Sequence, residues 1–201
     1  MLKKALITGS AVGIGRAIAF DLVSKGFDVA FHYKNSVSAA KQASQEAATY
    51  GVKSIALQAD VTKPNQAKSL VETAAEELGG LSVVVNNVGN YLRKPISQTS
   101  LEDWYEMLDS NLNATFYVTQ TAIPYLQAGG WGRIVNFAFV SAQHMIADDK
   151  HSAYRIAKAG IIIYTKSLAK ELIKDKITAN VVSPGIAENS IGLEEVRLVG
   201  H

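Results

Sequence analysis

Short apolar segments of strand length alternate along this chain with longer segments that have the period of an amphipathic helix. The short segments are apolar without interruption, as in Val83-Val84-Val85 and Ile134-Val135, which is typical of strands buried on both faces. Such strands, each followed by a helix, predict an α/β fold in which helices cover both faces of a parallel sheet.

The pattern places strands at residues 4–8, 28–33, 54–59, 82–86, 133–139 and 178–182, and helices at 14–25, 38–50, 65–78, 101–127 and 152–174. Gly26, Gly51 and Gly79 follow three of the helices, where a left-handed residue is favourable. Ser100, with Asp103 three positions later, predicts the N-terminal cap of the fourth helix. No repeat or linker divides the 201 residues, so we expect a single domain over 1–201.

Charge and cysteine content exclude several classes of protein. The 20 Lys and Arg residues against 18 Asp and Glu leave a net charge of +2, which argues against a nucleic-acid partner. The chain has no cysteine, which rules out disulfides, a thiolate nucleophile and a cysteine-ligated zinc site, and favours the cytoplasm. The first apolar run, residues 5–7, is too short for a signal peptide or a membrane span, so we expect no membrane association.

A glycine-rich segment, Gly9-Ser10-Ala11-Val12-Gly13-Ile14-Gly15, joins the first predicted strand to the first helix. Its spacing, G-x-x-x-G-x-G, differs from the common G-x-G-x-x-G of dinucleotide sites. Glycines there let the backbone turn tightly and approach a pyrophosphate, which a helix N-terminus stabilises. They also suit a plain tight turn, and it is the position at the carboxyl ends of parallel strands that favours a nucleotide.

The end of the second strand favours NADP over NAD. No acidic residue lies between positions 29 and 45, where an NAD site usually has an Asp or Glu for the ribose hydroxyls. The segment Tyr33-Lys34-Asn35-Ser36 offers a cation and small donors for a 2′-phosphate, with Arg16 or His32 as further candidates. The lysine also fits a solvated loop charge, and Asp60 either bonds an adenine amino group or caps the next turn.

Tyr154 and Lys158 stand four residues apart in the last predicted helix, so their side chains share one face. A free tyrosine has a pKa of about 10, and lowering it to about 7 takes roughly 4 kcal/mol. A neighbouring ammonium and the positive ring of an oxidised nicotinamide together supply such an effect. The spacing alone occurs by chance on many helices, so it gains weight only together with the glycine-rich turn.

Together, these and further motifs resemble the short-chain dehydrogenase/reductase family, in its order and at its separations, over residues 1 to 186. The matching elements are Thr8-Gly9-Ser10-Ala11-Val12-Gly13-Ile14-Gly15, Asp60-Val61, Asn86-Asn87-Val88-Gly89, Asn111, Tyr154-Arg155-Ile156-Ala157-Lys158 and Ser183-Pro184-Gly185. Val88 departs from the alanine that the family more often has. The resemblance implies a doubly wound parallel sheet (Rossmann fold) that binds NADP(H).

The resemblance also implies roles for individual residues. Tyr154 would be the proton donor or acceptor, and Lys158 would hold the nicotinamide ribose and lower the pKa of the tyrosine. Asn111 would distort its helix and hold a water of a proton relay. The implied cofactor-binding residues are Gly9, Ser10, Gly13, Ile14, Gly15, Tyr33, Lys34, Asn35, Ser36, Asp60, Val61, Asn87, Gly89, Tyr154, Lys158, Pro184 and Gly185.

The catalytic serine of the family has two candidate positions. Counting back thirteen residues from Tyr154 reaches Ser141, whereas counting forward along the fifth strand puts Phe139 there. We favour Ser141, because only a hydroxyl donates a hydrogen bond to a substrate carbonyl oxygen; an ordinary loop serine is the alternative.

The function that follows is an NADPH-dependent carbonyl reductase, similar to 3-oxoacyl-carrier-protein reductases. A pteridine-type C=N reductase and a nucleotide-binding protein without turnover are the alternatives. His144, Asp148, Asp149 and His151 fit no standard ligand spacing, so we expect no metal site.

In the family, the helices at 101–127 and 152–174 pack against a second subunit, which implies a homo-oligomer, a dimer or a tetramer. The aromatic residues Trp104, Tyr105, Phe116 and Tyr117 would then belong to that interface, or alternatively to the core. Residues 186–201 resemble only the start of the family's substrate-covering segment. We therefore expect the C-terminal strand of the sheet to be missing, which would leave the sixth strand as an edge.

Overall fold

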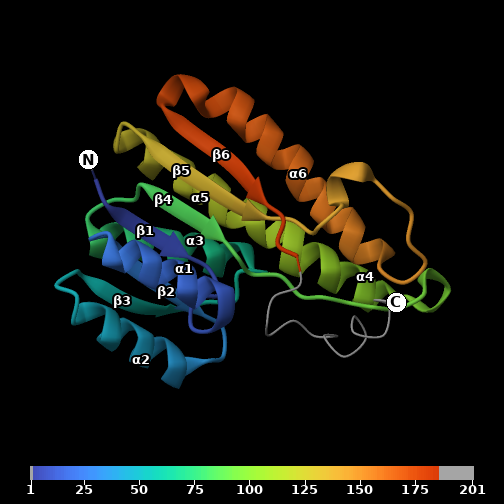
Figure 1. Ribbon diagram of the computed structural model, residues 1–201, viewed down its shortest axis with the longest axis horizontal. Coiled ribbons are helices and arrows are strands. Elements are labelled where there is room, and N and C mark those ends of the chain that lie inside the picture. Colours follow the sequence, from blue (N-terminus) through green and yellow to red (C-terminus); the bar gives the residue numbers. More distant parts are fainter. Residues whose placement is uncertain (1, 186–201) are drawn as a thin grey trace.

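The computed structural model describes residues 2–185, which form a six-stranded parallel sheet with the order β3-β2-β1-β4-β5-β6 (Figure 1). The sheet is doubly wound, as expected, because the strand order reverses direction at β1 and continues with β4. The strands are β1 (Lys4–Ile7), β2 (Asp28–Tyr33), β3 (Ser54–Gln58), β4 (Val83–Asn86), β5 (Gly132–Phe137) and β6 (Ile177–Val182).

The helices divide between the two faces of the sheet. They are α1 (Gly13–Ser24), α2 (Val37–Ala48), α3 (Pro64–Leu78), α4 (Leu101–Met107), α5 (Ala114–Ala128) and α6 (Ser152–Leu172). Leu6 of β1 belongs to the core that α3, α5 and α6 cover, whereas its neighbours Ala5 and Ile7 belong to the core under α1 and α2. Alternate residues of one strand thus serve two cores, which explains why these strands are apolar throughout.

The helix predicted over 101–127 is not continuous. It begins with the predicted capping box, in which Ser100 accepts from the Asp103 amide and Asp103 accepts from the Ser100 amide. Leu108–Asn113 then forms a π-helical segment between α4 and α5. Its cause is local, because the Asn111 side chain donates to the Met107 and Asn90 carbonyls and the Thr115 hydroxyl donates to the Asn111 carbonyl. The distortion that the resemblance implied is therefore present.

The other predicted elements are confirmed with small shifts at their ends. The fifth strand ends at Phe137, two residues earlier than expected, and the sixth helix ends at Leu172, where the short 3₁₀ turn Ile173–Asp175 follows. Gly26, Gly51 and Gly79 have the positive φ angles expected after helices.

β6 lies at one edge of the sheet among the described residues, and β3 lies at the other. The expected shortened C-terminal segment, residues 186–201, lies outside the described residues, as does any strand beyond β6. Over the part of the chain that is described, no helix has both the length and the apolar character needed to cross a membrane.

Candidate active site

The glycine-rich turn lies at the carboxyl end of β1 and is built so tightly that side chains would not fit. Gly9 and Gly13 have φ angles of +63° and +59°, which favour glycine. A Cβ on Gly15 would lie 2.4 Å from the Gly9 carbonyl oxygen and 2.6 Å from Asn87 Nδ2. Asn87 fastens the turn from the next strand along the sheet, since its side-chain nitrogen lies 3.1 and 3.2 Å from the Thr8 and Gly9 oxygens. At Gly13 an added Cβ would meet no atom within 4 Å, so a ligand can approach the backbone there.

His32 braces the same turn from β2. Its Nδ1 accepts a hydrogen bond from the Gly9 amide at 2.9 Å, and its Nε2 lies 3.1 Å from the Ala59 carbonyl oxygen. Burial lowers the pKa of His32, because the charged form loses its hydration, so the ring is neutral at pH 7. The suggestion that His32 helps to bind a phosphate is therefore wrong. Arg16 pairs with Glu46 on α2, with 2.6 Å between Nη2 and Oε2.

The end of β2 presents the predicted segment Tyr33–Ser36 toward solvent, with Lys34 as its one cation. The Lys34 ammonium lies 2.9 Å from Asp60 Oδ2. Burial opposes the charge of Asp60, but hydrogen bonds from Lys34 and Thr62 outweigh that effect and lower the pKa of Asp60 to about 2. Asp60 also accepts from the Thr62 amide and hydroxyl, so it does cap the following turn, as one alternative proposed.

Tyr154, near the start of α6, is enclosed by aromatic rings. The rings of Tyr91 and Phe139 meet it edge-on, with centroids 5.1 and 5.4 Å away. Burial and the Tyr91 phenol raise the pKa of Tyr154 to about 12. The expected lowering by Lys158 is absent, because the ammonium lies over the ring, 5.6 Å from its centroid, in a buried position that also disfavours charge.

Lys158 is almost fully buried, with 5% of its surface exposed. Its ammonium donates to the Phe137 carbonyl oxygen at 2.9 Å, just where β5 ends. Burial lowers the pKa of Lys158 to about 8. A cation kept in such a place at a net cost in stability points to a functional site.

Asn111 faces Lys158 across Gly89. A Cβ on Gly89 would lie 2.3 Å from Asn111 Oδ1 and 3.2 Å from Lys158 Nζ, so this position has room only for glycine. The Asn111 Oδ1 atom is buried and has no hydrogen-bond partner among residues 2–185. An unpaired buried oxygen beside a buried ammonium fits a water or a ligand hydroxyl between them.

The two candidate positions for the serine differ in their surroundings. Phe139 packs against Tyr154, with Arg155 over its other side at 5.2 Å. Ser141 is half-buried and has a φ angle of +67°, unusual for a residue other than glycine. No hydrogen bond to its hydroxyl forms within the described part of the chain, so the role of Ser141 stays a prediction.

Pro184, together with Ile14 after the glycine-rich turn, lines an apolar cavity of about 460 Å³. The remaining lining comes from α1 and from strands β4, β5 and β6: Ile18, Leu22, Val83, Val85, Val135, Phe137 and Val182. Gly185 follows Pro184 and is exposed, whereas Val61 is buried in the core. The cavity offers an apolar surface next to the nucleotide turn.

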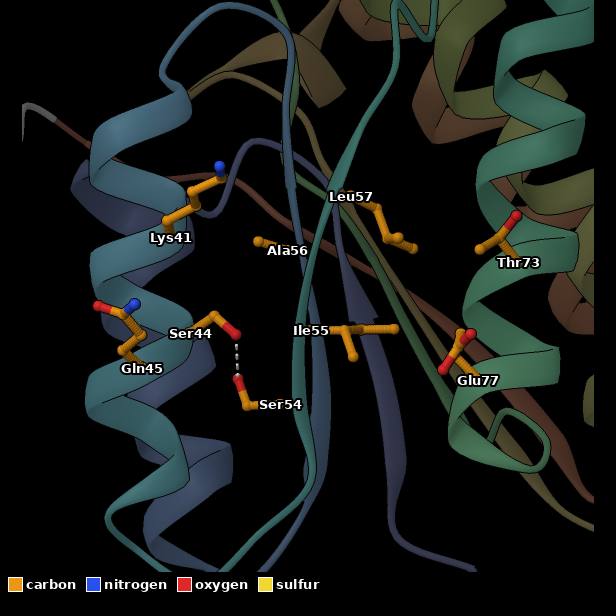
Figure 2. A pocket seen from close by; sticks show the side chains of 9 residues that line it. All are labelled: Lys41, Ser44, Gln45, Ser54, Ile55, Ala56, Leu57, Thr73 and Glu77. Atoms are coloured by element: carbon orange, nitrogen blue, oxygen red, sulfur yellow. Dashed lines mark hydrogen bonds between the residues drawn. The ribbon is translucent and has the colours of Figure 1, made fainter.

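A second hollow lies away from these residues, at the β3 edge of the sheet. It is a groove of about 420 Å³. Figure 2 shows Lys41, Ser44 and Gln45 of α2 on one side and Thr73 and Glu77 of α3 on the other. Two of its hydroxyls, those of Ser44 and Ser54, bond to each other at 3.0 Å. None of the predicted site residues lines it.

The structure gives the acidic and histidine residues before α6 a different use from metal binding. Asp148 Oδ1 accepts from His151 Nδ1 at 2.8 Å, and Asp148 Oδ2 lies 3.2 Å from Arg155 Nη2. No group of three or more potential ligands that could hold a metal ion occurs within residues 2–185. Tyr91, which the sequence analysis missed, bonds His151; its place two residues after Gly89, beyond the end of β4, was the available signal.

A doubly wound sheet with a glycine-rich turn, a Tyr-Lys pair and an asparagine in a π-helical segment defines a dinucleotide-dependent oxidoreductase. The family model for short chain dehydrogenases matches residues 3–196. This chain therefore belongs to the short chain dehydrogenase family.

Known proteins resemble the chain over most of its length. The 3-oxoacyl-[acyl-carrier-protein] reductase FabG of Staphylococcus aureus is 35% identical over 185 residues, which are 92% of this chain and 74% of the relative. A short chain dehydrogenase from Burkholderia cenocepacia, solved in complex with NADP, has a TM-score of 0.89 at 33% identity, covering 98% of this chain and 81% of that one. A blue fluorescent protein from a metagenomic library, solved with NADPH, has a TM-score of 0.87 at 33% identity, covering 94% and 78%.

The burial of Lys158 predicts that Lys158→Met stabilises the cofactor-free protein near neutral pH. The fall in pKa from 10.5 to about 8 corresponds to roughly 3 kcal/mol of destabilisation by the charged form. The lost hydrogen bond to Phe137 offsets about 1 kcal/mol of the gain. We expect Tm at pH 7 to rise by several degrees, at about 2–4 °C per kcal/mol.

The difference in stability between Lys158→Met and the wild type shrinks as pH rises from about 8 to 10.5. In that window the folded wild-type chain binds fewer protons than the unfolded chain, so the wild type gains stability. Lys166→Met, an exposed lysine of the same helix, is the matched control and leaves Tm nearly unchanged. Thermal unfolding of the three proteins at pH 7 and pH 10 measures both effects. A lower Tm for Lys158→Met at pH 7 contradicts the prediction.

Proposed function

We propose that this protein is an NADPH-dependent carbonyl reductase that acts on a small 3-oxoacyl-type substrate. The observation that carries the proposal is the buried Lys158 ammonium beside Tyr154, facing Asn111 across Gly89, at the carboxyl end of the sheet. The Staphylococcus aureus relative, a 3-oxoacyl-[acyl-carrier-protein] reductase, supports the substrate class. We also propose that residues 1–201 are one domain that carries both the nucleotide site and the catalytic residues.

The residues of the chain fit an NADP cofactor. Gly9, Gly13 and Gly15 would hold its pyrophosphate at the N-terminus of α1, and the exposed Tyr33–Ser36 segment would hold its 2′-phosphate. Lys158 and Asn111 would contact its nicotinamide end, where Pro184 and Ile14 supply an apolar surface. The Burkholderia cenocepacia structure with NADP supports this choice. The remaining predicted contacts are Ser10, Asp60, Val61, Asn87, Gly89 and Gly185.

Lys34→Ala is expected to raise the Kd for NADPH at least tenfold and to leave the Kd for NADH nearly unchanged. One charge-assisted hydrogen bond to the 2′-phosphate is worth about 1.5–3 kcal/mol, and NADH lacks that group. Lys41→Ala removes an exposed cation from the adjoining helix α2 and serves as the control. Fluorescence titration of the wild-type protein and both variants with each cofactor measures the six dissociation constants. Tighter binding of NADH than NADPH by the wild-type protein would contradict the cofactor assignment.

In the reaction, the bound cofactor supplies hydride to the carbonyl carbon, and the chain supplies the proton. Tyr154 is protonated at neutral pH, since its pKa is raised to about 12, so its phenol donates to the carbonyl oxygen and protonates the alkoxide that forms. Lys158 and the oxygen of Asn111 lie behind it and continue the relay that returns a proton to the phenol. A second hydroxyl beside the substrate oxygen completes the site, and Ser141 is the candidate from sequence.

Tyr154→Phe is expected to lower kcat by at least a hundredfold, because the general acid is lost while the ring remains. Tyr50→Phe, on an exposed tyrosine at the end of α2, is the control. Loss of NADPH absorbance with acetoacetyl-CoA, 7,8-dihydrobiopterin and diacetyl measures turnover. Retention of most of the wild-type rate by Tyr154→Phe contradicts the assignment.

The same substrates separate the alternative functions. Response to the pterin alone favours a C=N reductase, and NADPH binding with no turnover on any substrate favours a protein that only binds nucleotide.

We further propose a cytoplasmic homo-oligomer that associates through the 101–127 and 152–174 helices. Exposed apolar side chains on these helices support this interface, among them Tyr105, Phe116 and Ile163, which are 58%, 44% and 57% exposed. Trp104 and Tyr117 are half-buried, and Tyr117 packs on the core. Sedimentation equilibrium is expected to give a dimer or tetramer for the wild-type chain and a lower mass for Phe116→Asp. An unchanged mass for the variant contradicts the interface.

A further inference from the structure

A hydrogen-bonded chain of three side chains ends beside Tyr154, and neither the family motifs nor the relatives assign it. Asp148 Oδ1 lies 2.8 Å from His151 Nδ1, and His151 Nε2 lies 2.7 Å from the Tyr91 hydroxyl oxygen. The ring of Tyr91 packs edge-on against Tyr154 at 5.1 Å. Two segments far apart in sequence, the loop after β4 and the loop before α6, thus lie side by side (Figure 1). The contact of Tyr91 with Tyr154 places them beside the proposed proton donor.

We propose that Tyr91 is a further catalytic residue, whose hydroxyl donates the second hydrogen bond to the substrate oxygen, and that His151 is a positioning residue that holds it. The proposal rests on the proposed carbonyl-reductase function. It assigns to Tyr91 the task that the family gives to a serine at the end of β5.

The surroundings of Tyr154 favour Tyr91 for this task. Phe139 occupies one of the two candidate serine positions and presents an apolar ring to Tyr154. Within residues 2–185, the Ser141 hydroxyl forms no hydrogen bond with Tyr154. The Tyr91 phenol, by contrast, is close enough to the Tyr154 phenol to help raise the pKa of Tyr154.

The chemistry of the groups fixes the direction of the hydrogen bond between His151 and Asp148. An ionised Asp148 only accepts, so His151 Nδ1 carries a proton and donates to it. Three contacts keep Asp148 ionised and in place: the Lys150 amide, His151 and Arg155, which together lower its pKa against the opposing effect of burial. For Tyr91 to act on the substrate, Nε2 must donate to the Tyr91 oxygen, and the phenol O–H then donates to the substrate oxygen. No bond is made or broken in this step.

Tyr91→Phe tests the catalytic role, because it removes the hydroxyl and keeps the ring. We expect kcat with acetoacetyl-CoA to fall about a hundredfold, the cost of losing one donor to a developing oxyanion. The Kd for NADPH and Tm stay near wild-type values. Tyr50→Phe, on the exposed tyrosine that follows α2, is the control. Near-wild-type kcat in Tyr91→Phe overturns the proposal.

A double-mutant cycle tests the positioning role of His151. We expect His151→Phe to lower kcat about tenfold in the wild-type chain and to have almost no further effect in Tyr91→Phe, because the two residues act as one unit. His151→Gln, whose amide nitrogen also donates, recovers part of the rate. If the losses in kcat caused by His151→Phe and Tyr91→Phe multiply in the double variant, and His151→Phe also has a lower Tm, His151 has a structural role and the assignment is overturned.

If the wild-type chain fails to oxidise NADPH with every carbonyl substrate tested, the proposed function itself is overturned, which is a different outcome from an active Tyr91→Phe. The hydrogen bond between Tyr91 and His151 can still be tested in that case, by a measurement that does not depend on turnover. Long-range ¹H–¹⁵N correlation spectra of the imidazoles are expected to show a shifted Nε2 signal of one histidine in Tyr91→Phe. Identical spectra overturn the Tyr91–His151 bond and the role that depends on it.

Discussion

The buried ammonium of Lys158 is the constraint around which the site is arranged. Charge in that position costs stability, as its pKa of about 8 shows, and one carbonyl oxygen, that of Phe137, is its hydrogen-bond partner within the described chain. The opposing Asn111 oxygen is buried without a partner, and Gly89 leaves the space between them open. The fold therefore maintains two unfavourable polar groups that a bound cofactor and an ordered water would satisfy together.

The aromatic rings that enclose Tyr154 favour reduction of a carbonyl over oxidation of an alcohol. Tyr91 and Phe139 remove water from the phenol, and its pKa rises to about 12. A phenol that keeps its proton is ready to donate, which suits reduction of a carbonyl. Oxidation of an alcohol requires the phenolate, which the chain alone disfavours, so a positive nicotinamide ring would be needed to stabilise it.

The nucleotide turn depends on contacts between neighbouring strands. Gly15 approaches the Gly9 carbonyl so closely that any side chain would displace it, while His32 from β2 and Asn87 from β4 hold the turn from both sides. The neutral His32 and the paired Arg16 leave Lys34 as the cation of the Tyr33–Ser36 segment, and Asp60 holds that cation at the end of β2. Recognition of a 2′-phosphate would then depend on whether the phosphate displaces Asp60 from Lys34.

The sequence by itself determined the order of strands and helices, the glycine-rich turn and the Tyr-Lys pair, because these depend on local periodicity, turn geometry and fixed spacing. It also indicated the distorted helix at Asn111 through resemblance. Only the tertiary structure decided what surrounds each group: that Lys158 is buried deeply enough to lower its pKa, that His32 is a neutral brace, and that Tyr91 and His151, sixty residues apart, bond to each other. Burial and contacts between distant segments set the pKa and hydrogen-bond partners of a side chain, and neither can be read from spacing along one chain.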